Sequence, residues 1–207
     1  RNDNVSGYNS KTTGSLGYDF DITPEWSVGL AGNTGYRVPT FADLYTPLSF
    51  GYQGNPNLKP ETSRNIELRT AWRTESTSLS INAWQTRYRD LINGYVCDET
   101  FNCTAENVDR ATVRGISVNA EHRFDNTRIY AGADFMNPKD DESGKRLIRR
   151  AKQAYRIGAS HTFGQATVGA DFTHTSARYD DKQNTEAKRL GSYGVLNLHA
   201  SYAFSKN

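Results

Sequence analysis

The sequence predicts an all-β fold, an antiparallel up-and-down sheet that forms a segment of a transmembrane β-barrel. Three observations predict it. Apolar and polar residues alternate with a period of two along nine segments of the 207-residue chain. Short turns and long polar loops alternate between those segments, and aromatic residues gather beside the short turns. Every second side chain would then face lipid, while its neighbours would face a wet interior.

The composition excludes several other classes. Hydrophobic residues make up 36% of the chain, whereas a water-soluble domain is about 45–50% apolar. Aromatic residues make up 12%, too many for a disordered polar chain. No run approaches the ~18 apolar residues that a transmembrane helix needs. The formal net charge of +2 comes from interspersed acidic and basic residues, so nucleic acid is not an expected partner.

Nine strands are predicted, each with one apolar and one polar face. Residues 64–73 are typical, because Ile66, Leu68 and Trp72 alternate with polar residues. The predicted strands are residues 14–22, 26–34, 64–73, 78–86, 114–124, 127–136, 154–163, 166–174 and 194–204. Burial of these apolar side chains in a dry protein core would contradict the membrane interpretation. The test positions are Leu68, Ile81, Val118 and Ile157.

The predicted connections alternate in length. Tight turns are expected at residues 23–25, 74–77, 125–126 and 164–165. Long polar loops are expected at residues 36–62, 89–109, 138–148 and 175–192. Residues 1–13 would end a further loop, and residues 205–207 would form a further turn. This asymmetry is typical of outer-membrane barrels, whose periplasmic turns are short and whose extracellular loops are long.

Aromatic side chains lie on the apolar face next to the short turns. They are Phe20, Trp26, Trp72, Phe124, Phe163, Tyr202 and Phe204. Aromatic belts of this kind mark the interfaces of membrane barrels. A soluble meander with one wet face would also show alternation. The loop asymmetry and the belt favour the membrane protein, with the outer membrane as its location and membrane lipid as a partner.

The two cysteines, Cys97 and Cys103, lie in one predicted loop. With no histidine nearby they make a poor zinc site, and their spacing differs from the redox Cys-x-x-Cys. We therefore favour a disulfide that closes a small loop, which implies an oxidising compartment. The chain does not start with Met and shows no signal peptide, so a mature or excised segment is expected.

Two motifs resemble a known family. Residues 35–45 read Gly-Tyr-Arg-Val-Pro-Thr-Phe-Ala-Asp-Leu-Tyr, and residues 54–63 read Gly-Asn-Pro-Asn-Leu-Lys-Pro-Glu-Thr-Ser. The pair resembles the G-[YF]-[RK]-x-P and G-N-P-x-L-x-P-E segments of TonB-dependent outer-membrane receptors. Residues 89–92 and 111–116 resemble two further motifs of that family, although Ser117 replaces the usual Glu.

The resemblance implies a barrel of about 22 strands, occluded by an N-terminal plug and driven by the TonB complex of the inner membrane. Residues 1–207 would form part of the barrel domain, with the plug domain absent. Nine strands of such a barrel would leave two open edges, whose unpaired backbone groups are costly in lipid. The isolated segment is therefore expected not to transport alone. It would close into a smaller barrel or self-associate through its free edges.

A third motif bears on the transported ligand. Residues 147–153, Leu-Ile-Arg-Arg-Ala-Lys-Gln, are similar to the L-L-R-R-A-K-Q segment of vitamin B12 (cobalamin) receptors, and residues 175–180 resemble a second segment of that subfamily. By this resemblance Arg149 would bind cobalamin at the extracellular mouth. A second contact of the subfamily, a Tyr, aligns with Gln183. Strict alternation would turn Arg149 outward, unless a bulge intervenes.

Other functions remain as alternatives. A siderophore or haem receptor of the same family would bind an iron chelate at the same mouth. A passive porin would share the barrel but would not explain the motif at residues 54–63. An outer-membrane enzyme would need a catalytic group, and the four histidines lie scattered among strands, although His199 could meet Asp171 or Ser201. No catalytic residue, cofactor or metal site is expected, because the acidic residues 140–142 suit a hydrated loop better than a calcium site.

Overall fold

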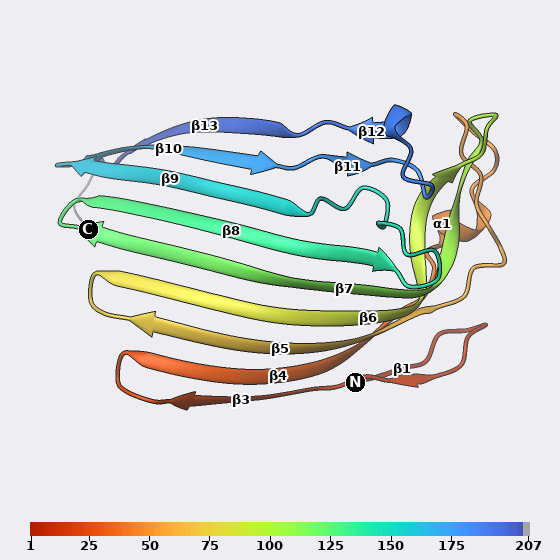
Figure 1. Ribbon diagram of the computed structural model, residues 1–207, viewed down its shortest axis with the longest axis horizontal. Helices are drawn as coiled ribbons and strands as arrows, with labels where there is room; N and C mark the ends of the chain where they lie inside the picture. The colour runs from red at the N-terminus through yellow and green to blue at the C-terminus, as the bar shows by residue number, and fades with distance from the viewer. Residues whose placement is uncertain (205–207) are drawn as a thin grey trace.

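The computed structural model describes residues 1–204, with the exception of the side chains at positions 94 and 95. Nine strands of this part of the chain form one antiparallel sheet (Figure 1), in the order β13-β10-β9-β8-β7-β6-β5-β4-β3. They are β3 (Ser15–Asp21), β4 (Trp26–Arg37), β5 (Glu61–Arg73), β6 (Thr77–Cys97), β7 (Cys103–Phe124), β8 (Thr127–Asp140), β9 (Gln153–Phe163), β10 (Ala166–Thr175) and β13 (Tyr193–Tyr202). The predicted all-β, up-and-down fold is confirmed.

Short elements occupy the remaining connections. They are β1 (Asn2–Asp3), β2 (Lys11–Thr12), α1 (Phe41–Tyr45), β11 (Arg178–Tyr179), the 3-10 helix η1 (Glu186–Lys188) and β12 (Arg189–Leu190). β1 pairs with β2, and β11 pairs with β12. Neither α1 nor any other helix of the described residues is long and apolar enough to cross a membrane.

The register of the sheet lines up the apolar residues in rows on one face. Leu68 pairs with Leu30 on one side and with Ala83 on the other. Ile116 and Phe135 continue the same row on β7 and β8. One face of the sheet is therefore apolar across several strands, as the alternation predicted.

This apolar face is open rather than packed inside the protein. Leu68 is 58% exposed, Ile81 40% and Ile157 60%, and Val118 is half-buried. An apolar surface of this extent is unfavourable in water, but it suits the hydrocarbon of a bilayer. The test positions named from the sequence therefore agree with the membrane interpretation.

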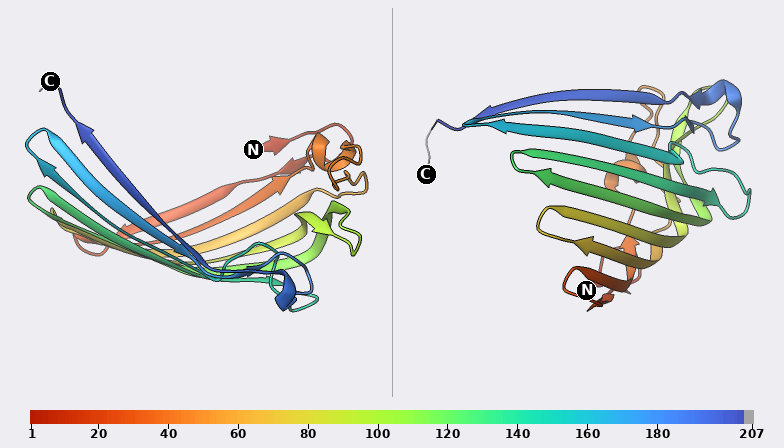
Figure 2. Two further views of the ribbon diagram at one scale, coloured as in Figure 1. Left: turned by 90° about the horizontal axis from the view of Figure 1, so that it is seen from above. Right: turned by 60° about the vertical axis from the view of Figure 1, so that its left-hand side comes forward.

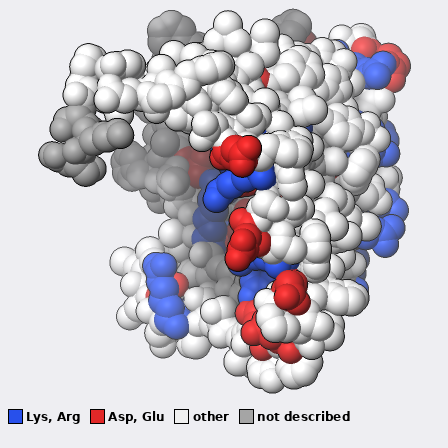
Figure 3. All heavy atoms as spheres, turned by 90° about the vertical axis from the view of Figure 1, so that its left-hand side faces the viewer, with Lys and Arg blue, Asp and Glu red and all other residues white. Residues whose placement is uncertain are grey.

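The opposite face is polar and carries ion pairs between strands. Arg69 on β5 reaches across Gly29 on β4 to bind Asp19 on β3. A side chain at Gly29 would collide with both partners, so the glycine allows the pair to form. Glu121 binds Arg128, with the Nη2 and Oε2 atoms 2.7 Å apart. Figure 3 shows acidic and basic side chains along the hollow of the sheet.

The sheet is strongly curved (Figure 2), with β3 and β13 as its edge strands. In the described residues these two strands do not pair with each other, so the first of the two expected alternatives, closure into a smaller barrel, is not observed. Whether copies self-associate through the edges stays a prediction.

The short turns lie at one end of the sheet and the long connections at the other (Figure 1). Several connections differ from the sequence-based expectation, among them residues 175–192, which contain β11, η1 and β12. Residues 89–109 are not a long loop, because β6 and β7 continue to Cys97 and from Cys103 and leave only residues 98–102 between them. Residues 36–62 contain helix α1. The predicted turn at residues 205–207 lies outside the described residues.

Dense packing is found at the long-loop end. One cluster joins Leu44 of α1, Leu58 of the following loop, Ile92 of β6 and Ala105 of β7. A second cluster joins Leu91, Ala111 and Leu147. These contacts between segments far apart in the chain explain why β6 and β7 extend beyond the apolar band, since burial stabilises the hairpin.

Candidate functional site

The motif at residues 54–63 ties the loop after β4 to the β6–β7 hairpin. The Nδ2 of Asn55 donates to the carbonyl oxygen of Ala105 at 3.1 Å. The backbone N–H of Lys59 donates to Oδ1 of Asn107 at 2.8 Å, and Nδ2 of Asn107 donates back to the carbonyl oxygen of Lys59 at 3.0 Å. The motif therefore joins two segments at the long-loop end of the sheet.

Helix α1 is held against the same motif. Oγ1 of Thr40 accepts from the backbone N–H of Asp43 at 3.1 Å, and Oδ2 of Asp43 accepts from the backbone N–H of Thr40 at 2.9 Å. This reciprocal capping box fixes the start of the helix. At Gly54, a Cβ atom would lie 2.7 Å from backbone atoms of residues 44–46. Because the approach is so close, only glycine fits there.

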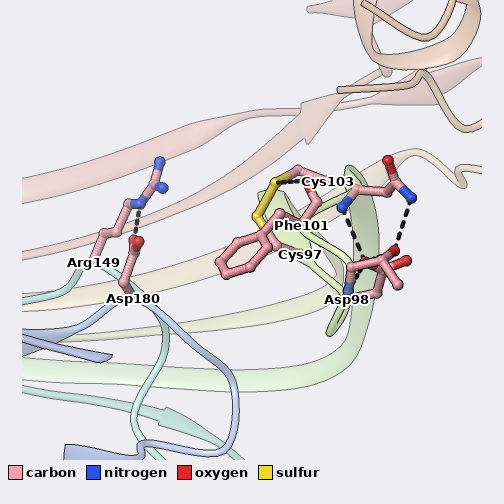
Figure 4. The surroundings of a disulfide bond; sticks show 8 residues. Cys97, Asp98, Phe101, Cys103, Arg149 and Asp180 are labelled. Carbon is pink, nitrogen blue, oxygen red and sulfur yellow. Dashed lines mark hydrogen bonds and ion pairs between the residues drawn. A yellow bond between two sulfur atoms is a disulfide. The ribbon is translucent and has the colours of Figure 1, made fainter. Parts of the chain in front are cut away.

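A disulfide closes the β6–β7 hairpin at its tip. Cys97 and Cys103 are direct cross-strand partners and are bonded through their sulfur atoms (Figure 4), as favoured from the sequence. A disulfide restricts the freedom of the loop that it closes. The tip of the hairpin is therefore held in a restricted conformation at the long-loop end of the sheet.

The tip of the hairpin is organised around the carboxylate of Asp98. Oδ1 of Asp98 accepts from the hydroxyl of Thr100 at 2.8 Å and from the backbone N–H groups of Thr100 and Asn102, each at 2.9 Å. The Thr100 hydroxyl and the backbone N–H of Asn102 hold the pKa of the Asp98 carboxyl below its ordinary value, because hydrogen bonds to an ionised carboxylate favour the ionised form.

A cavity of about 810 Å³ lies at this end of the molecule, among three segments far apart in the sequence. These segments are residues 53–56, residues within 96–106 and residues within 181–188. Charged side chains of both signs line the cavity: Asp98, Glu99, Glu106, Asp181, Lys182 and Lys188. A cavity with mixed charges and amides can bind a large polar ligand through many hydrogen bonds.

Two contacts join the hairpin to the segment that precedes β13. Nζ of Lys182 lies 3.1 Å from Oε2 of Glu106, and Nζ of Lys188 lies 6.0 Å from the centroid of the Phe101 ring. Sequence reasoning did not identify these four residues. Lys182 and Glu106 are 76 positions apart in the chain, so no local pattern could connect them.

Arg149 lies in the connection between β8 and β9, outside any strand, with a positive φ of 56°. Its backbone N–H donates to the carbonyl oxygen of Tyr179 at 2.7 Å, and its Nε donates to Oδ1 of Asp180 at 2.5 Å (Figure 4). The alternation that would turn Arg149 outward does not apply in such a turn. Gln183, which aligns with the second subfamily contact, lines the cavity.

Each of the four histidines contacts a side chain on a neighbouring strand. Nδ1 of His199 lies 3.2 Å from Oδ2 of Asp171 on the polar face, and no hydroxyl group hydrogen-bonds to His199 in the described part of the chain. The pairs on the apolar face are His122 with Thr77 at 2.7 Å and His161 with Thr127 at 2.6 Å. His174 stacks on Tyr155, with ring centroids 5.9 Å apart.

The acidic residues 140–142 form part of a turn. Asp140 accepts from the backbone N–H of Glu142 at 2.9 Å and from the hydroxyl of Ser143 at 2.5 Å. Oδ2 of Asp141 accepts from the hydroxyl of Thr112 at 2.8 Å. Across the described residues, no group of three or more His, Cys, Asp or Glu side chains is arranged to hold a metal ion.

Comparison with known proteins identifies the family. Residues 1–207 match the family model described as TonB dependent receptor-like, beta-barrel. The chain is 32% identical over 213 residues to the vitamin B12 transporter BtuB of Photobacterium profundum. That match covers 100% of this chain and 34% of the relative, so the chain spans about a third of the relative's length.

Solved structures share the fold. The copper transporter OprC has a TM-score of 0.75 at 15% identity, over 96% of this chain and 32% of that one. The ferric enterobactin receptor PfeA of Pseudomonas aeruginosa has a TM-score of 0.73 at 19% identity, over 96% of this chain and 33% of that one. At such identities the likeness shows the fold alone. Together with the family match over its whole length, it means that the chain belongs to the TonB-dependent receptor β-barrel family of the outer membrane.

Proposed function

We propose that the protein containing this chain is an active-transport receptor that takes up cobalamin across the outer membrane. The observation that carries the proposal is the 32% identity with a vitamin B12 transporter along the whole chain. The cavity at the long-loop end would hold the ligand. Its volume of about 810 Å³ and its lining from three separate segments suit a large molecule.

In this proposal the loops capture the ligand and Arg149 contacts it from outside the cavity lining, since its partner Asp180 directly precedes Asp181, which lines the cavity. Cobalamin carries many amide groups and a phosphodiester, whose oxygen atoms accept hydrogen bonds. A guanidinium offers several N–H donors in a fixed plane. The contact of Arg149 with Asp180 would orient that plane, and the positive φ of Arg149 would fix where the side chain leaves the backbone.

The remaining steps of transport would be mechanical. Residues 1–207 would supply part of the barrel domain, and a plug domain elsewhere in the protein would fill the lumen. The polar face of the sheet would hydrogen-bond that plug, and the TonB complex would displace it. No covalent step or cofactor is needed, so the protein would not be an enzyme. The pair of His199 and Asp171 would stabilise the lumen wall.

A calorimetric titration of the full-length protein with cyanocobalamin tests the proposal. We expect micromolar or tighter binding. Replacing Arg149 by Ala should weaken it about 10-fold or more, because a hydrogen bond from a charged group is lost. Arg73, which lies beside a short turn at the other end of the sheet, is the matched control, and Arg73→Ala should leave the affinity unchanged.

Two results would overturn the proposal in different ways. If the wild type does not bind cyanocobalamin, the ligand is wrong, and haem or a ferric siderophore should bind instead at the same cavity. If the wild type binds but Arg149→Ala binds equally well, the ligand is right and the assignment of Arg149 is wrong.

A further inference from the structure

The cavity at the long-loop end and Arg149 depend on two different connections of the chain. Arg149 lies between β8 and β9, whereas the residues within 181–188 that line the cavity lie between β11 and β12. A ligand that is held by the cavity and contacted by Arg149 requires the two connections to keep a fixed distance from each other. A residue that sets this distance must bind both of them.

Asn184 binds both connections through its side-chain amide. Its Oδ1 accepts from the backbone N–H of Arg146 at 2.7 Å, and its Nδ2 donates to the carbonyl oxygen of Arg146 at 3.0 Å. The same Nδ2 donates to the carbonyl oxygen of Asp181 at 3.2 Å, within its own connection. The amide therefore makes the pair of backbone hydrogen bonds that a neighbouring strand would make.

The side chain of Asn184 is not part of the cavity wall. The residues on both sides of it, Gln183 and Thr185, line the cavity, but Asn184 does not. Its φ of 56° lies in the left-handed region, which asparagine adopts more readily than most residues. Asp181 holds this turn, because its carboxylate accepts from the backbone N–H of Thr185 at 3.0 Å and from the Thr185 hydroxyl at 2.9 Å.

Arg149 depends on its backbone for its position. Its backbone N–H donates to the carbonyl oxygen of Tyr179 at 2.7 Å. Its ion pair with Asp180 (Figure 4) joins side chains that are 46% and 37% exposed, and a pair so exposed contributes little by itself. The guanidinium therefore keeps one position only while residues 146–149 stay docked on the connection that carries Tyr179 and Asp180.

This docking begins at Arg146, three residues before Arg149. Besides the two backbone bonds from Asn184, Nη1 of Arg146 donates to the carbonyl oxygen of Ala177 at 3.1 Å. The Arg146 guanidinium also lies 5.2 Å from the centroid of the Tyr179 ring. The side chain of Arg146 can rotate about its own bonds, whereas the amide of Asn184 binds the backbone directly and so fixes the path of the chain toward Arg149.

We propose that Asn184 is a positioning residue for ligand capture, whose amide fixes the distance between Arg149 and the cavity wall without contact with the ligand. The inference rests on the proposed function, because it takes Arg149 to be a ligand contact. Without the amide, residues 146–149 move relative to Gln183 and its neighbours, and the guanidinium no longer meets a ligand that lies in the cavity.

A double-mutant cycle, measured by calorimetric titration of the full-length protein with cyanocobalamin, tests this role. Asn184→Gly removes the amide and keeps the left-handed backbone, which glycine adopts freely. It should weaken binding about 5-fold, less than Arg149→Ala does, because the side-chain contacts of Arg146 remain. In the Arg149→Ala protein the same change should cause no further loss, since two residues that act through one contact are not additive.

Asn107 provides the matched control. Its amide makes the same reciprocal pair of hydrogen bonds with the backbone of Lys59 and also binds the carbonyl oxygen of Asp90, rather than residues 146–149. Any loss of affinity from Asn107→Ala should therefore be equal with and without Arg149. If Asn184→Gly is likewise additive with Arg149→Ala, the amide only stabilises the loop end, and the proposal is overturned.

Hydrogen exchange of the ligand-free protein is a second measurement, which does not require cobalamin. Asn184→Gly should quicken exchange at residues 146–149, where the Arg146 N–H loses its acceptor, and leave residues 98–102 unchanged. Unchanged exchange at residues 146–149, or faster exchange at both places, would overturn the proposal. If the wild type does not bind cyanocobalamin, the proposed function fails, and the exchange result still supports or overturns the link that Asn184 makes.

Discussion

Apolar side chains meet opposite surroundings in the sheet and at the loop end. Leu68, on the outer face of β5, is 58% exposed, whereas Leu58, in the loop that precedes β5, is 4% exposed. The sheet offers its leucines to lipid, and the loop end buries its leucines against protein. Apolar side chains of the sheet are therefore stabilised by contact with lipid, whereas those of the loop end are stabilised by burial within the protein.

The largest expected effect comes from the packed loop end. Replacing Leu58 by Ala should lower the free energy of unfolding by about 4 kcal/mol, because the removed atoms leave a cavity beside Leu44 and Ile92. Replacing Leu68 by Ala should cost only about 2 kcal/mol, since lipid fills the space. Urea unfolding of the full-length protein in lipid vesicles measures both. Equal losses would mean that the two regions do not differ in packing.

A charge on the apolar face is the converse test. Leu68→Arg should cost about 3 kcal/mol in the same vesicles, because a guanidinium enters the hydrocarbon. The control, Glu67→Arg, places the same group on the opposite, polar face of the sheet. It should lower the free energy of unfolding much less than Leu68→Arg does. A tolerated Leu68→Arg would show that this face does not contact lipid.

The disulfide should have an intermediate effect, confined to the loop end. Replacing Cys97 and Cys103 together by Ser should cost about 2 kcal/mol through the freedom regained by the small loop. Hydrogen exchange should quicken at residues 96–106 and stay unchanged at the short turns. If exchange quickened along the whole of β6 and β7, the hairpin would depend on the disulfide more widely than its packing indicates.

The smallest effect is the pH dependence of the hairpin tip. The pKa of Asp98 is lower in the folded protein than in the unfolded chain, so its contribution is present above the ordinary aspartate pKa of about 3.9. That contribution is lost as the pH falls through the folded value. Protease susceptibility of residues 98–102 should therefore rise below about pH 4. Asp98→Asn should be more susceptible near neutral pH and show a flatter profile.

Much of the sheet could be predicted because the alternation of apolar and polar residues is a local property of the chain. The period of two along residues 64–73 or 154–163 identifies a strand and tells which side chains share a face, without knowledge of any partner. The short turns could also be predicted, from the few residues that separate neighbouring strands. The strand ends at residues 89–109 could not be predicted in this way, because polar residues such as Arg89 and Glu106 stand there at positions where the alternation would place apolar ones.

The candidate site was only partly accessible from the sequence. The disulfide was favoured because its two cysteines are close in the chain, and Arg149 was named by resemblance to a motif. The cavity was not foreseen, since Glu106 and Lys182 meet only when the long connections fold over one another. The like-charged pair of Arg64 and Arg87 was also missed, because only the register between β5 and β6 places these two residues opposite each other.

The sequence by itself determined which face of each strand is apolar, which connections are tight and which family motifs are present. These properties depend on neighbours within a few residues, where covalent geometry fixes the direction of each side chain. The tertiary structure decided how far β6 and β7 extend, how the loops enclose a cavity and which charges stand side by side. Those outcomes depend on pairings between distant segments, whose packing and repulsion arise only once the sheet has assembled.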